Sequence, residues 1–350
     1  MSVYIYLIII LVVGVLFFDN RLKPGKIYFI FSVLLLGIIA GLRSENVGHD
    51  TANYINIYNA VVSLDFSFLF TTTPYDVLEP GYLLISWCAG KIGCSAYDFI
   101  LLISIFDFVC IGYWIWKNSQ SPLFSLMIFY CMFYSFFVTG FRQSIAFAIV
   151  VLAYEDIKFR RWKRFGIIVF LAFLFHRTAL IFIPMYFLPK IKNTNASLLV
   201  TLLLFPVIYT FRSLVFPLLT MVSDRFENYQ ILNHGDATNY TVLLGLVSVA
   251  VFFISKNKPD LPVDFSRNLN CLLISFLIMP FVGLNGSIMR IAMYYTIAIS
   301  LLIPQVTSFL PSKSLNSTAK IITISVLIYL FVNTVISSPV YKYEFNSYFI

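Results

Sequence analysis

Long apolar runs separated by short polar stretches make up almost the entire chain. A helix needs about 20 predominantly apolar residues to cross the hydrocarbon core of a bilayer. We therefore treat each run as a candidate transmembrane helix. These runs are residues 3–18, 27–42, 80–94, 97–116, 122–139, 141–157, 165–188, 197–220, 240–255, 268–283, 288–304 and 320–338. The pattern predicts an all-α polytopic integral membrane protein with about 10–12 transmembrane helices, which form a single transmembrane domain over residues 1–350.

The composition excludes most other classes of protein. Only 11% of the 350 residues are charged and 60% are hydrophobic, whereas a soluble globular chain carries about 25% charged residues. A water-soluble globular protein, a disordered chain and a coiled coil are therefore ruled out. We attribute the net charge of +8 to basic loops on one side of a bilayer, so no nucleic acid partner is expected. The five cysteines and three histidines show no metal-ligand spacing, and no metal site is predicted.

Lys and Arg in the loops predict which helix ends face the cytoplasm. Loops 19–26 and 305–320 are basic and residues 158–164 form the densest basic cluster, so we expect all three inside. Loop 43–79 contains one Arg and five acidic residues, so it is predicted to be a periplasmic loop. Residues 221–239 then form a second periplasmic loop.

This orientation requires that some runs do not cross the membrane as plain helices. Five runs separate loop 19–26 from cluster 158–164, but two cytoplasmic loops need an even number of crossings. Segments 80–94 and 165–188 contain glycines, charges or proline, and we expect one or both to be re-entrant or broken. Such segments are tolerated only where they line protein or a watery cavity, so an outward-facing cavity is predicted. The alternative is that every run crosses and the cluster lies outside.

Two polar stretches at the predicted outer surface are candidate sites. Arg43 opens a stretch that includes Asp50 and ends at Tyr54, and its dense hydrogen-bonding and aromatic groups suit a sugar. A snorkelling Arg followed by a solvated loop is the other interpretation. Arg142 and Gln143 lie in a tight turn between two apolar runs. Arg142 is either a helix cap or a clamp for a diphosphate, which a forked guanidinium suits better than Lys does.

His176 is the one histidine within an apolar run. It is either a buried structural residue or a general base, because neutral imidazole accepts a hydroxyl proton well near pH 7. Arg290, close to Tyr294, is either a snorkelling residue or a phosphate contact, and Arg225 belongs to a charged and aromatic patch that also fits a solvated loop. Basic residues gathered on the outer side, where they should be depleted, favour an anionic partner such as a lipid-linked phosphate.

Short landmarks along the chain resemble the EpsG-like branch of the Wzy polysaccharide polymerases, which includes the O-antigen polymerases. They occur in the expected order over nearly the whole chain, and they are Arg43 with Val47-Gly48-His49-Asp50-Thr51-Ala52-Asn53-Tyr54, Glu79-Pro80-Gly81-Tyr82, Phe141-Arg142-Gln143-Ser144-Ile145-Ala146, Phe175-His176-Arg177-Thr178-Ala179-Leu180, Arg290 with Tyr294-Tyr295, and Pro339-Val340-Tyr341-Lys342-Tyr343.

The resemblance implies a glycosyltransferase of the bacterial inner (cytoplasmic) membrane. Such proteins polymerise undecaprenyl-diphosphate-linked oligosaccharide repeat units at the periplasmic face, as in O-antigen and lipopolysaccharide biosynthesis. The implied partners are these lipid-linked glycans, membrane lipid and a chain-length-determining co-polymerase, and no cofactor is expected. We expect Arg142 and Arg290 to contact the diphosphate with Arg43 close by, His176 or Asp50 to be the base, and Glu79 and Tyr82 to shape the site.

Other functions stay open at this point. An O-antigen ligase uses a similar donor, although the stretch from Arg43 through Asp50 to Tyr54 favours the polymerase. A lipid-linked oligosaccharide transporter predicts charges through both leaflets and often internal repeats, and the sequence shows no repeat. A membrane O-acyltransferase would also use a buried His, but it needs a route for its acyl donor.

Overall fold

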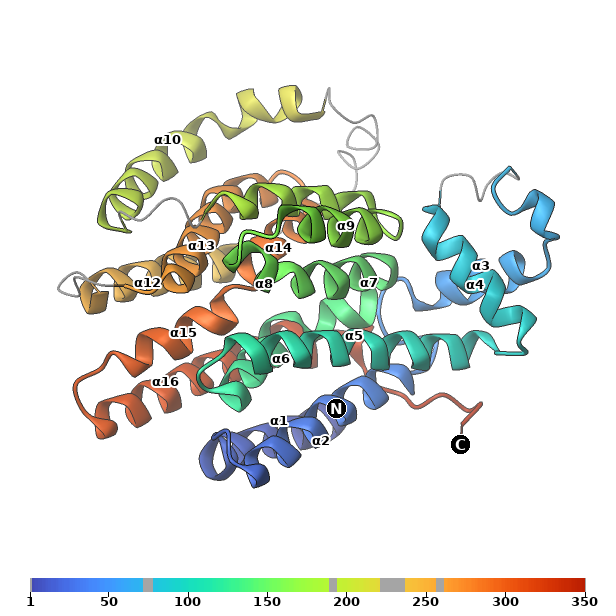
Figure 1. Ribbon diagram of the computed structural model, residues 1–350, viewed down its shortest axis with the longest axis horizontal. Coiled ribbons are helices and arrows are strands. Elements are labelled where there is room, and N and C mark those ends of the chain that lie inside the picture. The colour runs from blue at the N-terminus through green and yellow to red at the C-terminus, as the bar shows by residue number, and fades with distance from the viewer. Residues whose placement is uncertain (1, 72–77, 189–193, 221–236, 256–260, 350) are drawn as a thin grey trace. The chain divides into compact units, whose positions relative to one another are not determined.

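The computed structural model describes residues 2–71, 78–188, 194–220, 237–255 and 261–349. The chain divides into two compact units, residues 1–183 with 318–350 and residues 184–317. The helices of the first unit are α1 (Ser2–Val13), α2 (Lys23–Gly41), α3 (Thr51–Val62), α4 (Pro80–Lys91), α5 (Ala96–Asn118), α6 (Pro122–Thr139), α7 (Phe141–Val150), α8 (Tyr154–Lys158), α9 (Trp162–Phe173) and, from the C-terminal part, α16 (Lys313–Phe331) (Figure 1). Those of the second unit are α10 (Thr194–Thr220), α12 (Thr238–Ser255), α13 (Val263–Val282), α14 (Ile288–Thr296) and α15 (Ile299–Ser308).

Short non-α helices complete the list. They are the π-helices η1 (Gly14–Phe18) and η7 (Val332–Ile336) and the 3₁₀ helices η2 (Phe66–Phe68), η4 (Val151–Ala153), η5 (Arg177–Tyr186) and η8 (Pro339–Tyr341).

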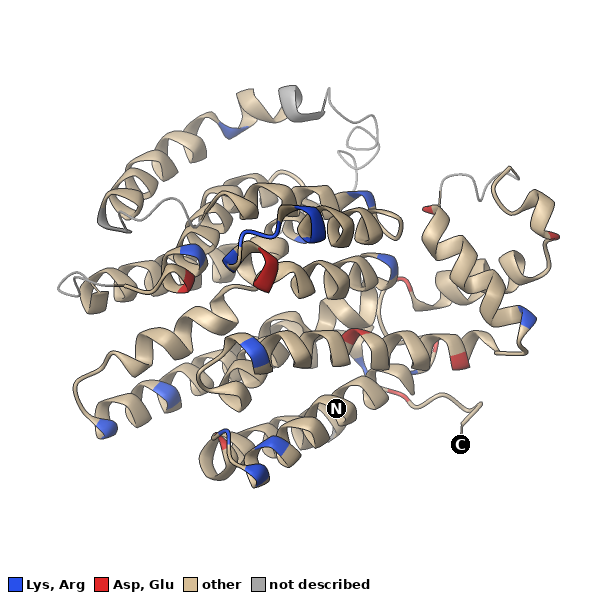
Figure 2. Cartoon of the chain, viewed as in Figure 1, with Lys and Arg blue, Asp and Glu red and all other residues tan. Residues whose placement is uncertain are grey.

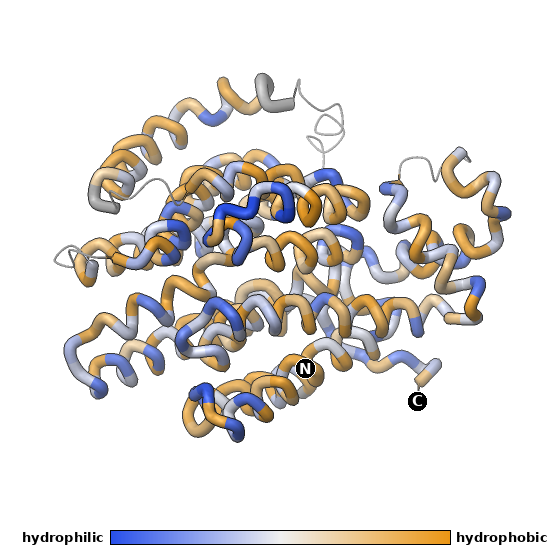
Figure 3. Tube along the Cα trace, viewed as in Figure 1, coloured by the Kyte–Doolittle hydropathy of each residue, from blue (hydrophilic) through white to orange (hydrophobic). Residues whose placement is uncertain are grey.

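The protein is a polytopic membrane protein. Within the described residues, eight helical stretches are long and apolar enough to cross a bilayer, one of them being α14 and α15 taken together over Ile288–Ser308, and Val3–Phe18 is a shorter apolar helix. Apolar residues continue around these helices, as Figure 3 shows, and charged residues are sparse on them (Figure 2). A helix that is apolar on all sides belongs in a membrane or in the core of a large protein.

The segments expected to be re-entrant or broken are indeed short. Helices α4 and α9 have 12 residues each, which corresponds to about 18 Å against the roughly 30 Å of a hydrocarbon core. After α9 the chain continues as η5, which contains Pro184. The runs 141–157 and 288–304, expected as plain helices, are instead divided into shorter helices. Hydropathy did not reveal these breaks, because the residues at the breaks are as apolar as the rest.

Helix α6 forms the core of the first unit. Every residue of α6 except Ser135 is buried, and α1, α2, α5 and α7 all pack against it. Helices α2 and α5 approach closely because small residues lie between them. A Cβ atom on Gly41 would lie 2.7 Å from the Cα of Leu101, and one on Gly112 would lie 2.8 Å from Val33. Small residues at such contacts allow membrane helices to pack by van der Waals contact.

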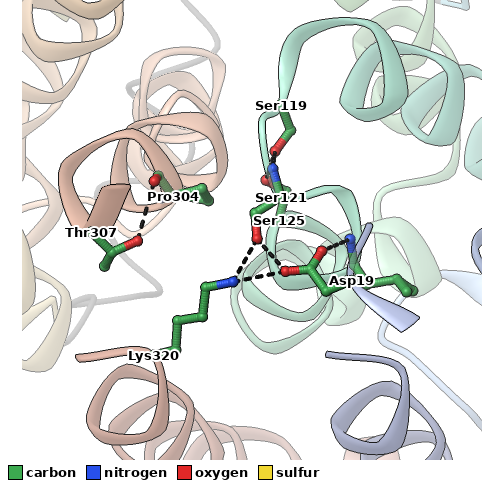
Figure 4. Close-up of polar contacts among 8 residues, drawn as sticks. Asp19, Ser119, Ser121, Ser125, Pro304, Thr307 and Lys320 are labelled. Atoms are coloured by element: carbon green, nitrogen blue, oxygen red, sulfur yellow. Dashed lines mark hydrogen bonds and ion pairs between the residues drawn. The ribbon is translucent and has the colours of Figure 1, made fainter. Parts of the chain in front are cut away.

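One end of the first unit is held by a polar cluster shown in Figure 4. Lys320 Nζ lies 2.9 Å from Asp19 Oδ2 and 2.8 Å from Ser121 Oγ. Asp19 also accepts a hydrogen bond from Ser121 Oγ and, at 3.1 Å, from the amide of Leu123 at the start of α6. A carboxylate at a helix N-terminus satisfies an amide that has no partner within the helix. These contacts join loop 19–22, the start of α6 and α16.

The C-terminal tail lies at the opposite end of α2. Ser44 N donates to Glu344 O at 2.8 Å, Gly48 N donates to Val340 O at 2.9 Å, and Asn346 N donates to Leu42 O at 2.9 Å. The tail therefore closes over the stretch that follows Arg43. The loop charges predict which membrane face this end occupies, and that orientation stays a prediction. The single transmembrane domain over residues 1–350, predicted from the apolar runs, also stays a prediction.

Candidate active site

The site lies where α4, α7 and the end of α9 meet in the first unit. The amide of Gly81, in the first turn of α4, donates to Leu174 O at 2.8 Å. A Cβ on Gly81 would lie 2.7 Å from the same oxygen, so only glycine allows this approach. Glu79, the N-cap residue of α4, is thereby brought beside His176 just after α9. On α7, which begins directly after Gly140, Arg142 is the second residue.

Three ionisable side chains meet at this point. Arg142 Nη1 forms an ion pair with Glu79 Oε2, and His176 Nδ1 lies 3.4 Å from Glu79 Oε1. The Glu79 side chain is only 3% exposed, whereas Arg142 and His176 are 21% and 22% exposed. A buried carboxylate thus connects a permanent cation to an imidazole, and both of these partly face the exterior. Such a set can orient a base and present positive charge to an anion.

An aromatic wall lies against the cluster. Arg142 Nε donates to the hydroxyl of Tyr54 at 3.4 Å. The Tyr54 ring lies 5.9 Å from that of Tyr82 and 5.4 Å from that of Phe141. Burial raises the pKa of Tyr82, so its hydroxyl stays neutral at physiological pH. The rings of Tyr82 and Phe141 are fully buried and support Tyr54, which is 9% exposed, beside the charged cluster.

Gln143 and Asp50 lie on the elements that carry the cluster. Gln143 Nε2 donates to Thr178 Oγ1 at 3.3 Å and so connects α7 to the start of η5. Asp50 is the N-cap residue of α3, one turn before Tyr54, and its carbonyl accepts from the Tyr54 amide at 3.0 Å. Both residues therefore help to position side chains of the site.

Arg43 occupies a buried position beside this cluster. It is 1% exposed, and its guanidinium donates to Ala40 O, to Thr51 Oγ1 at 3.2 Å and to Ser104 Oγ at 3.4 Å. Burial lowers its pKa to about 10, so Arg43 remains a cation at neutral pH. Its guanidinium carbon lies 5.9 Å from the ring centroid of Phe141. Arg43 therefore supports the aromatic wall from behind, a placement that suits positioning better than direct binding.

The remaining predicted residues lie elsewhere. Arg290, which is exposed, and Tyr294, which is buried, belong to α14 of the second unit. Arg225 falls outside the described residues, as does most of loop 221–239. The structure thus brings together Tyr54, Glu79, Tyr82, Arg142 and His176.

The sequence analysis missed a buried carboxylate behind the site. Asp107, on α5, is 2% exposed and accepts a hydrogen bond from Ser144 Oγ on α7 at 2.6 Å. A lone carboxylate within an apolar run is itself a signal, because such residues are costly and usually paired or functional. As for metals, no group of three or more His, Cys, Asp or Glu in the described part of the chain is placed to hold an ion.

Comparison with known proteins identifies the family. The model of the EpsG family matches residues 26–349. No curated protein and no solved structure matches the chain significantly. The family supports a membrane polysaccharide polymerase-like function in general. Because the match extends over nearly all of the sequence and includes every residue of the cluster, the chain belongs to the EpsG family.

Proposed function

We propose that this protein is a membrane glycosyltransferase that joins undecaprenyl-diphosphate-linked oligosaccharide repeat units into O-antigen or a similar surface polysaccharide. The reaction would take place at the periplasmic face of the bacterial inner membrane. The observation that carries the proposal is the cluster in which Glu79 lies between Arg142 and His176. Membership of the EpsG family supports it.

His176 is the proposed general base. Its Nδ1 faces the buried Glu79 carboxylate, which fixes the ring and stabilises the imidazolium that forms when Nε2 takes a proton. The hydroxyl of the acceptor sugar loses this proton to His176 while its oxygen attacks the anomeric carbon of the donor. The new glycosidic bond forms as the bond from that carbon to the diphosphate breaks.

Arg142 is the proposed contact for the departing diphosphate, which leaves with the electron pair of the broken bond. Its contacts with Glu79 and Tyr54 each use one N–H group of the guanidinium, and a guanidinium has five. The remaining donors can contact phosphate oxygens. Positive charge aimed at a leaving group is among the largest contributions to catalysis. Arg290 is a second candidate for the same anion, and Asp50 is an alternative base.

Tyr54 is the proposed contact for a sugar ring, and Tyr82, which is fully buried, supports the Tyr54 ring from behind. A tyrosine hydroxyl and ring suit a carbohydrate, and the hydrogen bond from Arg142 to Tyr54 places that residue beside the charged cluster. Aromatic residues here would orient the acceptor hydroxyl toward His176. A separate co-polymerase that sets chain length is the proposed protein partner.

Reconstitution tests the proposal directly. Purified protein in liposomes is mixed with a synthetic undecaprenyl-diphosphate repeat unit, and the products are separated on a gel. We expect a ladder of multimers, and we expect Arg142→Ala and His176→Ala to lower its rate of formation by about 100-fold or more. Arg164→Ala is the matched control, because Arg164 is 62% exposed and pairs with Asp156 away from the cluster.

Other outcomes would assign another function. Movement of unchanged substrate across the liposome bilayer would identify a transporter. Transfer of a single unit to an added lipid A core acceptor, without a ladder, would identify a ligase.

A further inference from the structure

The second compact unit contains a pocket that the proposed function does not use. Its walls come from α10, α12 and α13, and its volume is about 290 Å³. Of the described residues that line it, Arg212 alone is charged, and the others are apolar or carry hydroxyl groups. A mostly apolar cavity with a single cation is typical of a site for an amphiphile with a negative group.

Arg212 carries a charge that no acid balances within the described part of the chain. Its guanidinium carbon lies 3.8 Å from the ring centroid of Tyr209, and Nη1 donates to the carbonyl of Tyr209 at 2.8 Å. Its Nε atom is buried and has no hydrogen-bond partner among the described residues. A charge in a membrane helix is costly and is usually paired. The pocket therefore offers an oriented cation to an anion.

The apolar part of the pocket continues toward the lipid-facing surface of α10. Phe205 lines the pocket and is held in place by Phe276, on which it stacks with ring centroids 4.2 Å apart. On α10 itself, Leu203 and Leu214 are 63% and 73% exposed. An exposed apolar helix face in a membrane protein is covered by lipid chains, so a lipid chain can reach the pocket without crossing water.

Arg212 lies at a depth that suits a lipid phosphate. It is about two turns before the end of α10 at Thr220, and α12 begins at Thr238 on the same side of the unit. Two turns correspond to about 11 Å along a helix axis, and an Arg side chain can extend toward the headgroup level. The loop that joins these helices is predicted to be periplasmic, so this end belongs to the outer leaflet.

We propose that this pocket binds the phosphate group of an outer-leaflet lipid. Arg212 holds the phosphate oxygens through charge-assisted hydrogen bonds, while Phe205 and Met279 contact the start of the lipid chain. The proposal is independent of the polymerase reaction, because it concerns a different unit and requires no catalysis.

Native mass spectrometry of the full-length protein tests it. Delipidated protein in detergent is mixed with dioleoyl phosphatidic acid or with dioleoylglycerol, which has the same chains but no phosphate. We expect one phosphatidic acid to be retained, and we expect Arg212→Met to weaken its binding by about tenfold or more. Lys313→Ala is the control, because it removes an exposed cation at the start of α16 that does not line the pocket. The proposal would be wrong if phosphatidic acid bound equally to wild type and to Arg212→Met. It would also be wrong if dioleoylglycerol bound to wild type as well as phosphatidic acid does.

A second variant fills the pocket without removing the charge. A Cβ on Gly283 would contact only the carbonyl oxygen of Pro280, at 3.7 Å, and Gly283 has helical backbone angles. Gly283→Leu should therefore fold and should also lose the bound phosphatidic acid. Inorganic phosphate is added as a competitor to distinguish the source of the anion. Displacement of the lipid by millimolar phosphate would show that the pocket takes the free anion, and the lipid assignment would then be wrong.

Discussion

Glu79 is the residue on which the candidate active site depends most. It is nearly inaccessible, yet both Arg142 and His176 contact its carboxylate. Removing one member of a buried charged set leaves its partners without compensation, which costs more than the same change at the surface. Although the Glu79 side chain is only 3% exposed, its replacement should therefore lower the catalytic rate strongly.

Glu79→Gln should abolish most activity while preserving the fold. The amide has the size of the carboxylate but cannot stabilise an imidazolium or balance Arg142, so we expect ladder formation to slow by about 100-fold. Initial rates of polymer formation in liposomes provide the measurement. Glu79→Asp keeps the charge but is one methylene shorter, so its carboxylate lies farther from Arg142 and His176, and it should retain an intermediate rate. A Gln variant as active as wild type would exclude the proposed role.

Arg43 should act on stability more than on substrate binding. Its side chain is buried and bonded to Ala40, Thr51 and Ser104, so Arg43→Met leaves buried acceptors unsatisfied and should cost about 3 kcal/mol. Thermal unfolding in detergent measures this loss. If Arg43 instead contacted the diphosphate, Arg43→Met would unfold at the wild-type temperature and lose only substrate affinity.

At the scale of elements, a single glycine fixes α4 against the end of α9. Gly81→Ala would place a Cβ 2.7 Å from Leu174 O, a backbone atom that cannot move without its helix. The start of α4 must then shift, and Glu79 with it, so we expect a large loss of polymer formation. Gly166 on α9 provides the matched control, because nothing lies within 4 Å of its Cβ position. Gly166→Ala should be neutral or stabilise the protein by up to about 1 kcal/mol. Equal activity of both variants would contradict the role of Gly81.

The sequence predicted long helices well and broken ones less well. Length and hydropathy suffice for a helix such as α5, because a membrane allows few alternatives for a run of apolar residues. The short segment at 80–91 was predicted because glycines and a lysine interrupt its apolar pattern. The division of 288–304 into α14 and α15 was not predicted, because no glycine, proline or charged residue marks the break at Ile297 and Ala298.

At the scale of the whole molecule, the candidate site combines segments that are far apart in the sequence. The family landmarks identified Tyr54, Glu79, Arg142 and His176 singly, but no periodicity indicates that Glu79 would lie between the other two charged side chains. That arrangement follows from the contact of Gly81 with Leu174, which only tertiary structure reveals. The burial of Arg43 was missed for a similar reason, because the tail that covers it comes from the other end of the chain.

Removal of the C-terminal tail should therefore inactivate the protein although the tail contributes nothing to the charged cluster. A chain that ends at Ser338 loses the three backbone hydrogen bonds to residues 42–48 and the bond from Tyr343 Oη to Ile39 O at 2.7 Å. The stretch from Arg43 to Tyr54 would lose its support, and water would reach the guanidinium of Arg43. We expect slower polymer formation and a lower unfolding temperature. A chain that ends at Asn346 keeps all four bonds and should behave like wild type. Full activity of the shorter chain would show that the tail does not support the site.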